Sequence, residues 1–201
     1  GITITLLDDL SIDVAHLAFY RGTMDLGGFS VDIAGDLVIL GAAYSPDDLD
    51  WAGVDTRFDY PDSGLLKYPL AWPPGATSAA FGGVSGLGGA TITVGGDWNV
   101  STFAETNSLA LFNGASAAAG PYTITSNAGN DFYAVQLNAP GETYRQIDAA
   151  RVGTDLTLTA GEWQTNSQSL TVTQDVTGLP GAPLSAGGSE TISVGGSWDV
   201  A

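Results

Sequence analysis

Six aspartates lie within sixteen residues in the first half of this 201-residue chain, and their side chains could bind a metal ion. They are Asp47, Asp48, Asp50, Asp55, Asp59 and Asp62. Carboxylate oxygens are the ligands that Ca²⁺ prefers, and the ion takes about six to eight of them from flexible loops. The EF-hand pattern is absent, because its glycine and terminal glutamate are not in place. The segment predicts a Ca²⁺ site, against the alternative of a solvated acidic loop whose aspartates form turns beside Pro46 and Pro61.

Four aromatic residues share this acidic segment and could bind a sugar. They are Trp51, Tyr60, Tyr68 and Trp72. Aromatic faces stack on sugar rings while neighbouring carboxylates accept hydrogen bonds from the hydroxyls, so the segment could form a glycan-binding surface. The alternative is a small core, since about fifty residues must bury some apolar surface of their own.

One arginine, Arg57, stands between Asp55 and Asp59 and could act as a base beside bound Ca²⁺. Polysaccharide-cleaving β-helix enzymes use such an arrangement. The net charge of −17 opposes binding of an acidic polymer, and no Gly-x-Ser-x-Gly elbow accompanies the single histidine, His16. We therefore expect no catalysis and keep a polysaccharide-active enzyme as the third hypothesis.

Composition excludes several classes of partner. The chain has 22 acidic and only 5 basic residues, so it lacks the clustered lysines and arginines that bind phosphates. The same charge repels an anionic membrane surface, and no apolar run is long enough to span a bilayer. The absence of cysteine excludes disulfides and thiolate metal sites. We expect neither nucleic-acid binding nor membrane insertion.

The segments that must position these residues have the pattern of short strands. β-Branched and apolar residues alternate with Thr, Ser or Asp in residues 29–33, 90–94, 122–125, 156–159 and 170–173. Glycine-rich turns separate them, and the 28 glycines with few helix formers predict no helix. The chain is therefore expected to be all-β.

Two phrases of the sequence occur twice. Residues 90–100 resemble residues 190–200, and residues 22–37 resemble residues 161–176, in the same order. The repetition predicts one equivalent packing place for Trp98 and Trp198. Repeated units stack on one another, which favours a β-solenoid of parallel coils over the alternative, an antiparallel β-sandwich.

The organisation predicted is one continuous domain with a looped insertion. Residues 1–40 and 90–201 form solenoid coils, and residues 41–89, rich in Pro, Gly, Asp and aromatics, are inserted between them. Insertions in repeat arrays leave the rod as loops on one face, which is often the binding face. Both ends of the chain read as strands, which predicts continuation into another repeat or subunit.

The second half also resembles a known class of repeat. The runs 94–103, 109–114, 132–138 and 152–161 are similar to the repeats of giant bacterial surface proteins of the filamentous-haemagglutinin and autotransporter-passenger class. The resemblance covers residues 90–200 well and residues 2–39 more loosely, and the insertion departs from it. It implies a right-handed parallel β-helix, an extracellular place on the bacterial cell surface, and a role in adhesion, biofilm or sheath structure.

These observations lead to a ranked set of hypotheses. The first is a non-catalytic structural repeat module of an extracellular bacterial surface fibre, adhesin or sheath. It would associate with copies of itself, or with adjacent repeats of a longer chain, through stacked β-strands. The alternative is a Ca²⁺-dependent module that binds surface glycans through the 41–89 insertion.

Overall fold

The computed structural model describes most of the chain outside the insertion. The described residues are 3–12, 17–19, 23–26, 28–35, 37–39, 83–85, 89–100, 107–116, 119–126 and 132–200. Within these ranges the chain forms nineteen strands joined by turns, and no helix. The described part therefore contains no helix that could span a membrane.

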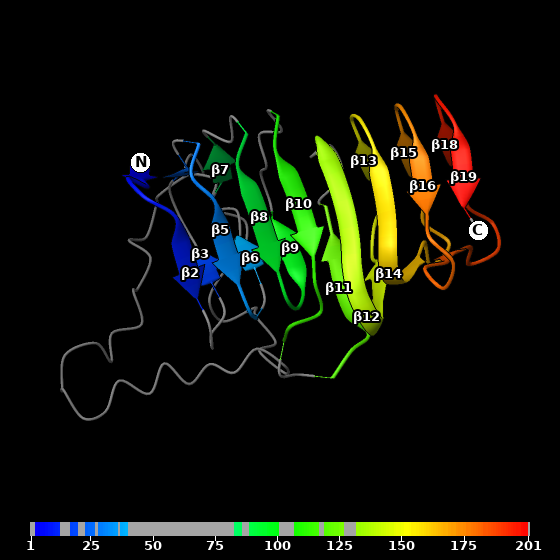
Figure 1. The fold of residues 1–201 in the computed structure, drawn as a ribbon, viewed down its shortest axis with the longest axis horizontal. Helices are drawn as coiled ribbons and strands as arrows, with labels where there is room; N and C mark the ends of the chain where they lie inside the picture. Colours follow the sequence, from blue (N-terminus) through cyan, green and yellow to red (C-terminus); the bar gives the residue numbers. More distant parts are fainter. Residues whose placement is uncertain are drawn as a thin grey trace, which may run out of the picture.

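The strands follow one another around three faces of a coil. Face 1 consists of β1 (Thr3–Thr5), β4 (Thr23–Asp25), β7 (Gly83–Ser85), β13 (Ala150–Val152), β15 (Leu170–Val172) and β18 (Ile192–Val194). Face 2 consists of β2 (Leu10–Ile12), β5 (Val31–Ile33), β8 (Thr91–Val94), β10 (Leu109–Phe112), the first parts of β12 (Ala134–Gln146) and β14 (Leu156–Gln164), β16 (Val176–Gly178) and β19 (Trp198–Val200). Face 3 consists of β3 (Leu17–Phe19), β6 (Leu37–Ile39), β9 (Trp98–Val100), β11 (Tyr122–Thr125), the second parts of β12 and β14, and β17 (Leu184–Ser185). In Figure 1 the strands of face 2 lie side by side along the molecule, and the strands of face 3 do the same.

Every strand pair is parallel, which makes the molecule a β-solenoid and confirms the predicted fold class. On face 2 the successive partners Val135, Leu156, Val176 and Trp198 stand 21, 20 and 22 residues apart in the sequence, one coil each. The β-sandwich alternative is wrong, because consecutive strands meet only after a full coil and never as antiparallel hairpins among the described residues.

The core fills the interior of the coil with the alternate residues of each strand. β8 shows the pattern: Ile92 and Val94 are buried while Thr91 and Thr93 are partly exposed. Five large aromatic side chains cluster inside the coil, in tilted or edge-to-face pairs with ring centroids 5.1–6.2 Å apart. They are Trp98, Phe112, Phe132, Tyr144 and Trp163, each exposed by 1% or less. This packing explains the period-two pattern, since parallel stacking places like positions above one another.

The coil continues in register on both sides of the insertion. Strands β7, β8 and β9 pair with β4, β5 and β6, which precede residues 40–82 in the sequence. The solenoid resumes at Gly83, inside the 41–89 segment. The coil therefore accommodates the intervening residues without interrupting its parallel stacking.

The duplicated phrases do not occupy the same place in the coil. Residues 91–100 turn from face 2 into face 3, where Trp98 pairs with Leu37 and is 1% exposed. Residues 191–200 turn from face 1 into face 2, where Trp198 pairs with Val176 and is 51% exposed. The prediction of one equivalent place for the two tryptophans is therefore wrong. The phrase encodes a strand, a tight glycine corner and a second strand, and more than one corner of the coil can take that shape.

Candidate functional site

The residues that the sequence singled out for chemistry all lie outside the described residues. The six aspartates proposed as Ca²⁺ ligands and the four aromatic residues proposed as a glycan platform fall between residues 47 and 72. The same holds for Arg57. Their roles stay predictions.

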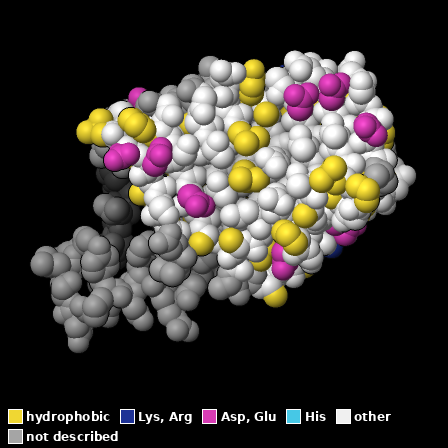
Figure 2. Space-filling view, in the orientation of Figure 1, with side chains coloured by type: hydrophobic (Ala, Val, Ile, Leu, Met, Phe, Trp, Pro, Cys, Tyr) yellow, Lys and Arg dark blue, Asp and Glu magenta, His cyan; other side chains and the backbone are white. Residues whose placement is uncertain are grey.

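The described carboxylates have a different use. Within the described ranges no three His, Cys, Asp or Glu side chains form a group that could hold a metal ion. Figure 2 shows the acidic side chains of the viewed face standing apart rather than gathered in one patch. Several of them accept hydrogen bonds from main-chain N–H groups of a neighbouring coil, as Asp97 does from Thr123 N at 2.6 Å. These aspartates belong to the fold.

One set of these bonds forms a ladder along the corner that leads from face 1 into face 2. We call this set the corner ladder. It consists of Asp9, Ser30, Asp155, Asp175 and Ser197, and each of these residues directly precedes a face 2 strand. Asp9 Oδ1 accepts from Ser30 N at 2.7 Å, Asp155 Oδ1 from Asp175 N at 3.1 Å, and Asp175 Oδ1 from Ser197 N at 2.6 Å. Each side-chain oxygen thus receives the N–H of the same position one coil later. A short side chain with an oxygen acceptor at this corner thus binds a main-chain N–H group that makes no hydrogen bond within the sheet.

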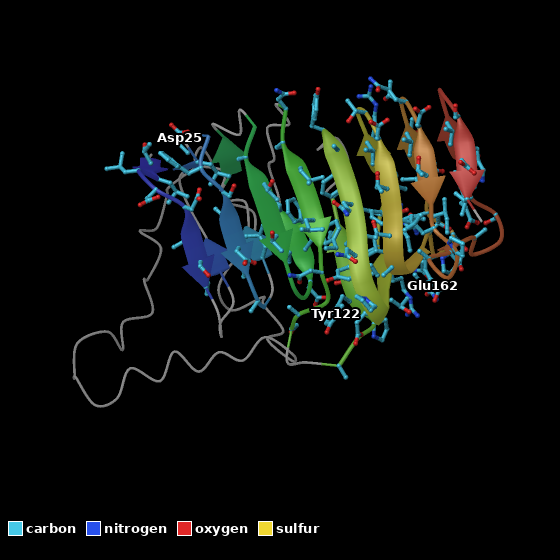
Figure 3. All side chains as sticks on the ribbon, viewed as in Figure 1. Asp25, Tyr122 and Glu162 are labelled. Carbon is cyan, nitrogen blue, oxygen red and sulfur yellow. The ribbon has the colours of Figure 1, made fainter. Side chains whose placement is uncertain are left out.

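Two glutamates near the C-terminal coils also accept several bonds. Glu162, labelled in Figure 3 on β14, accepts from Ser185 Oγ at 2.6 Å and from Thr143 Oγ1 at 3.2 Å. The Ser185 hydrogen bond is the main cause that lowers the pKa of Glu162. Glu190 accepts from Thr165 Oγ1 and from Gly188 N, and the Thr165 bond lowers the pKa of Glu190 to about 2. Both glutamates are held as carboxylates. Glu162 bonds side chains of β12 and β17, and Glu190 bonds the loop that follows β17.

Two sets of buried polar side chains are hydrogen-bonded and have a structural role. Trp163 Nε1 donates to Gln146 Oε1 at 2.8 Å, and Gln146 Nε2 donates to the carbonyls of Asp148 and Ser169 at 3.2 Å. The Tyr144 hydroxyl donates to Gly95 O at 3.0 Å and accepts from Gly114 N at 3.2 Å. Burial raises the pKa of Tyr144 above its ordinary range. These groups fix corners of the coil, because a buried polar atom without a partner would be costly.

The C-terminal coil presents the most unusual surface of the described part. We call it the C-terminal edge: β17, β18 and β19, each paired on one side only among the described residues. Ile192, Val194 and Val200 are partly exposed on it, and Trp198 is 51% exposed. Figure 1 shows β18 and β19 as the outermost strands at this end. Unpaired main-chain groups beside apolar side chains can accept another strand.

The opposite end of the stack is its counterpart, and we call it the N-terminal edge: β1, β2 and β3. On β2, Leu10 and Ile12 are partly buried against the core and Ser11 is exposed. Leu7, at the corner before β2, is 86% exposed. The sequence pointed to strand-like ends, but it gave no signal that Trp198 lies on an edge while Trp98 lies in the core.

No protein-family model, curated protein or solved structure matches this chain.

Proposed function

We propose that this chain is a non-catalytic structural module that associates through its stacked strands. In the form expected from the sequence, it belongs to a fibre, adhesin or sheath on the outside of a bacterial cell. Its partners are copies of itself or neighbouring repeats of a longer chain. The observation that carries the proposal is the C-terminal edge, where main-chain groups of three strands and the half-exposed ring of Trp198 face outward together.

A parallel solenoid suits a mechanical role. Its coils are joined by main-chain hydrogen bonds along the whole axis, and neighbouring coils add to one another's stability in a nearly linear way. Among the described residues β17, β18 and β19 are paired on one side only, so their other side presents the donors and acceptors that interior coils use for pairing. An edge of this kind templates further strands unless charge, proline or a cap covers it.

The acidic composition supports the same role. The corner aspartates at positions 9, 155 and 175 accept main-chain N–H groups, so these charges are part of the scaffold. The net charge of −17 keeps such rods apart sideways, because their long faces repel one another. Association is then directed to the ends, where main-chain pairing outweighs the repulsion.

The Ca²⁺-dependent glycan-binding alternative depends on residues of the insertion that are not described. It stays a prediction from the sequence, and the polysaccharide-active enzyme stays the third. Melting curves with added Ca²⁺ and with EGTA separate the first two hypotheses. The associating scaffold predicts the same melting midpoint in both, whereas the Ca²⁺-dependent module predicts a shift.

The proposal is tested by placing a charge at the edge. We expect Trp198→Lys to abolish the concentration-dependent association of the full chain in sedimentation velocity and the end-joined rods in electron micrographs. The matched control is Ile147→Lys, which charges a side chain of similar exposure, 45%, at a corner away from the edge. An unaltered sedimentation profile of Trp198→Lys, or a wild-type chain that stays monomeric at every concentration, would contradict the proposal.

A further inference from the structure

The geometry of the two end coils points to a specific joint. We propose that copies of this chain join head to tail, with β19 of one copy pairing in parallel with β2 of the next. Trp198 then stands opposite Leu10, Asp199 opposite Ser11, and Val200 opposite Ile12. This inference rests on the proposed function and adds to it the partner strand, its direction and its register.

The first argument is the continuity of the inward columns on face 2. One column runs through Val176 to Trp198, and the matching column at the other end begins with Leu10 and passes to Val31. Setting Leu10 above Trp198 continues an apolar column across the joint in the same parallel register as the other coils. The half-exposed indole would be covered by a partly buried leucine, and both side chains lose contact with water.

The second argument is the corner ladder. Asp175 Oδ1 accepts from Ser197 N, so the Ser197 hydroxyl occupies the next acceptor place, and among the described residues nothing donates to it. In the proposed register the residue above Ser197 is Asp9, whose own Oδ1 already accepts from Ser30 N. The ladder of one copy therefore meets the ladder of the next at the same corner, with a serine facing an aspartate. Asp9 N donates to Asp8 Oδ1 at 2.9 Å, so a bond to the Ser197 hydroxyl would replace this local one.

The third argument is charge, which separates this joint from one between like ends. In the head-to-tail joint the outward Asp199 faces the neutral Ser11. A two-fold joint between C-terminal edges would turn the strands antiparallel and bring the two Asp199 carboxylates, each at the centre of its three-residue strand, toward each other. A joint between N-terminal edges would crowd Asp8 and Asp9 of both copies. Like charges on facing strands destabilise a pair.

The order of strands also says which faces carry the joint. At the C-terminal edge the chain passes face 3, face 1 and face 2 in turn, as β17, β18 and β19. At the N-terminal edge it begins with face 1, as β1, β2 and β3. Stacking β1 on β18 and β2 on β19 leaves one strand position between β17 and the second copy's β3. Two of the three faces therefore pair directly, and repetition of this head-to-tail contact gives an open filament.

Disulfide trapping tests the joint, because the chain has no cysteine of its own. The test protein is the full chain with Ser11→Cys and Asp199→Cys. Adjacent strands lie about 4.8 Å apart, within the range of about 4.4–6.8 Å that a disulfide bridges between Cα atoms. In one molecule these positions lie at opposite ends of eight stacked strands, about 34 Å apart, so any bond joins two copies. The control pair is Asp32→Cys with Asp199→Cys, which the joint places two coils, or about 9.6 Å, apart.

Mild oxidation should convert most of the Ser11→Cys, Asp199→Cys protein into a ladder of dimers, trimers and larger species on a non-reducing gel. The control pair should give at least tenfold less. Efficient dimers from Asp199→Cys alone would show a joint between like ends and overturn the inference. So would equal ladders from the two pairs, or no ladder while micrographs still show end-joined rods, and in these cases the proposed function stands. A wild-type chain that never associates would overturn both.

Discussion

The duplicated phrase offers a comparison in which the sequence and the structure predict different results. Trp98 and Trp198 have nearly the same neighbours along the chain, so a repeat-based view expects replacement by alanine to cost the same at both positions. In the structure Trp98 is 1% exposed and Trp198 is 51% exposed. We therefore expect Trp98→Ala to destabilise the protein much more than Trp198→Ala.

The magnitudes follow from the surface that each ring buries. A buried aromatic side chain removes about 150–250 Å² from water, and at about 25 cal/mol per Å² this is worth about 4–6 kcal/mol. Trp98 also packs against Phe112 and Phe132, with ring centroids at 5.9 and 5.2 Å, so its removal leaves a closed cavity. We expect Trp98→Ala to cost about 3–5 kcal/mol in free energy of unfolding. Trp198 buries about half as much and leaves no closed cavity, so its loss should cost about 2–3 kcal/mol at most.

The measurement is urea unfolding followed by circular dichroism, which does not depend on the tryptophans as probes. The two variants and the wild type are compared at a concentration where sedimentation shows monomers, so that association does not contribute to the midpoint. The slope with urea should be the same for all three, which would show that the same surface unfolds. Equal costs within about 0.5 kcal/mol would refute the placement of Trp98 in the core and of Trp198 on the C-terminal edge.

Two further predictions test the polar groups. Tyr144→Phe removes the hydroxyl that bonds Gly95 O and Gly114 N, and should cost about 1–3 kcal/mol in thermal or urea unfolding. Tyr122→Phe, whose hydroxyl donates over 3.4 Å to Ser116 O, is the control and should cost less, and the reverse order would contradict the role of Tyr144. Glu190→Gln should lower the melting temperature near neutral pH, because its folded pKa of about 2 lies below the ordinary 4.5. The lowered pKa stabilises the fold fully above about pH 4.5, and this contribution disappears as the pH falls through about 2. Calorimetry should therefore show the difference between variant and wild type closing between these values, and a gap that is unchanged at pH 2 would count against the effect.

The sequence was sufficient for the fold class because the fold is determined by a local pattern. Alternating apolar and Thr, Ser or Asp residues specify strands with one buried side, and the recurrence of whole phrases indicates units that stack on one another. Residues 90–94 and 170–173 predicted two of these strands, and the structure has β8 and β15 there. In both strands every second residue is buried. These signals act over a few residues, so no long-range information was needed.

The face of the coil on which each phrase lies could not be predicted in this way. Residues 91–100 and 191–200 have the same local preferences, and the face on which each lands depends on the summed lengths of all the coils between them. Those lengths vary. Residues that pair between β8 and β10 are 18 apart in the sequence, and residues that pair between β10 and β12 are 25 apart. A sequence comparison aligns the phrases by their residues, whereas the structure aligns them by these accumulated lengths. The different faces of Trp98 and Trp198 follow from that difference, whereas the exposure of Trp198 follows from its place on β19, which is paired on one side only among the described residues.

The same reasoning explains why the acidic composition alone does not distinguish aspartates that bind a cation from aspartates that form turns. An aspartate at a turn and an aspartate that binds a cation look alike in a sequence, because both need a short side chain with an exposed oxygen. What distinguishes them is the neighbour one coil away, which for Asp155 and Asp175 is a main-chain N–H group. In a stacked coil such a neighbour always exists, except at the last coil. The carboxylates of Asp9, Asp155 and Asp175 are therefore used within the coil. Among the described residues the Ser197 hydroxyl accepts no bond of this kind, and it lies beside the strands that we propose to form the joint.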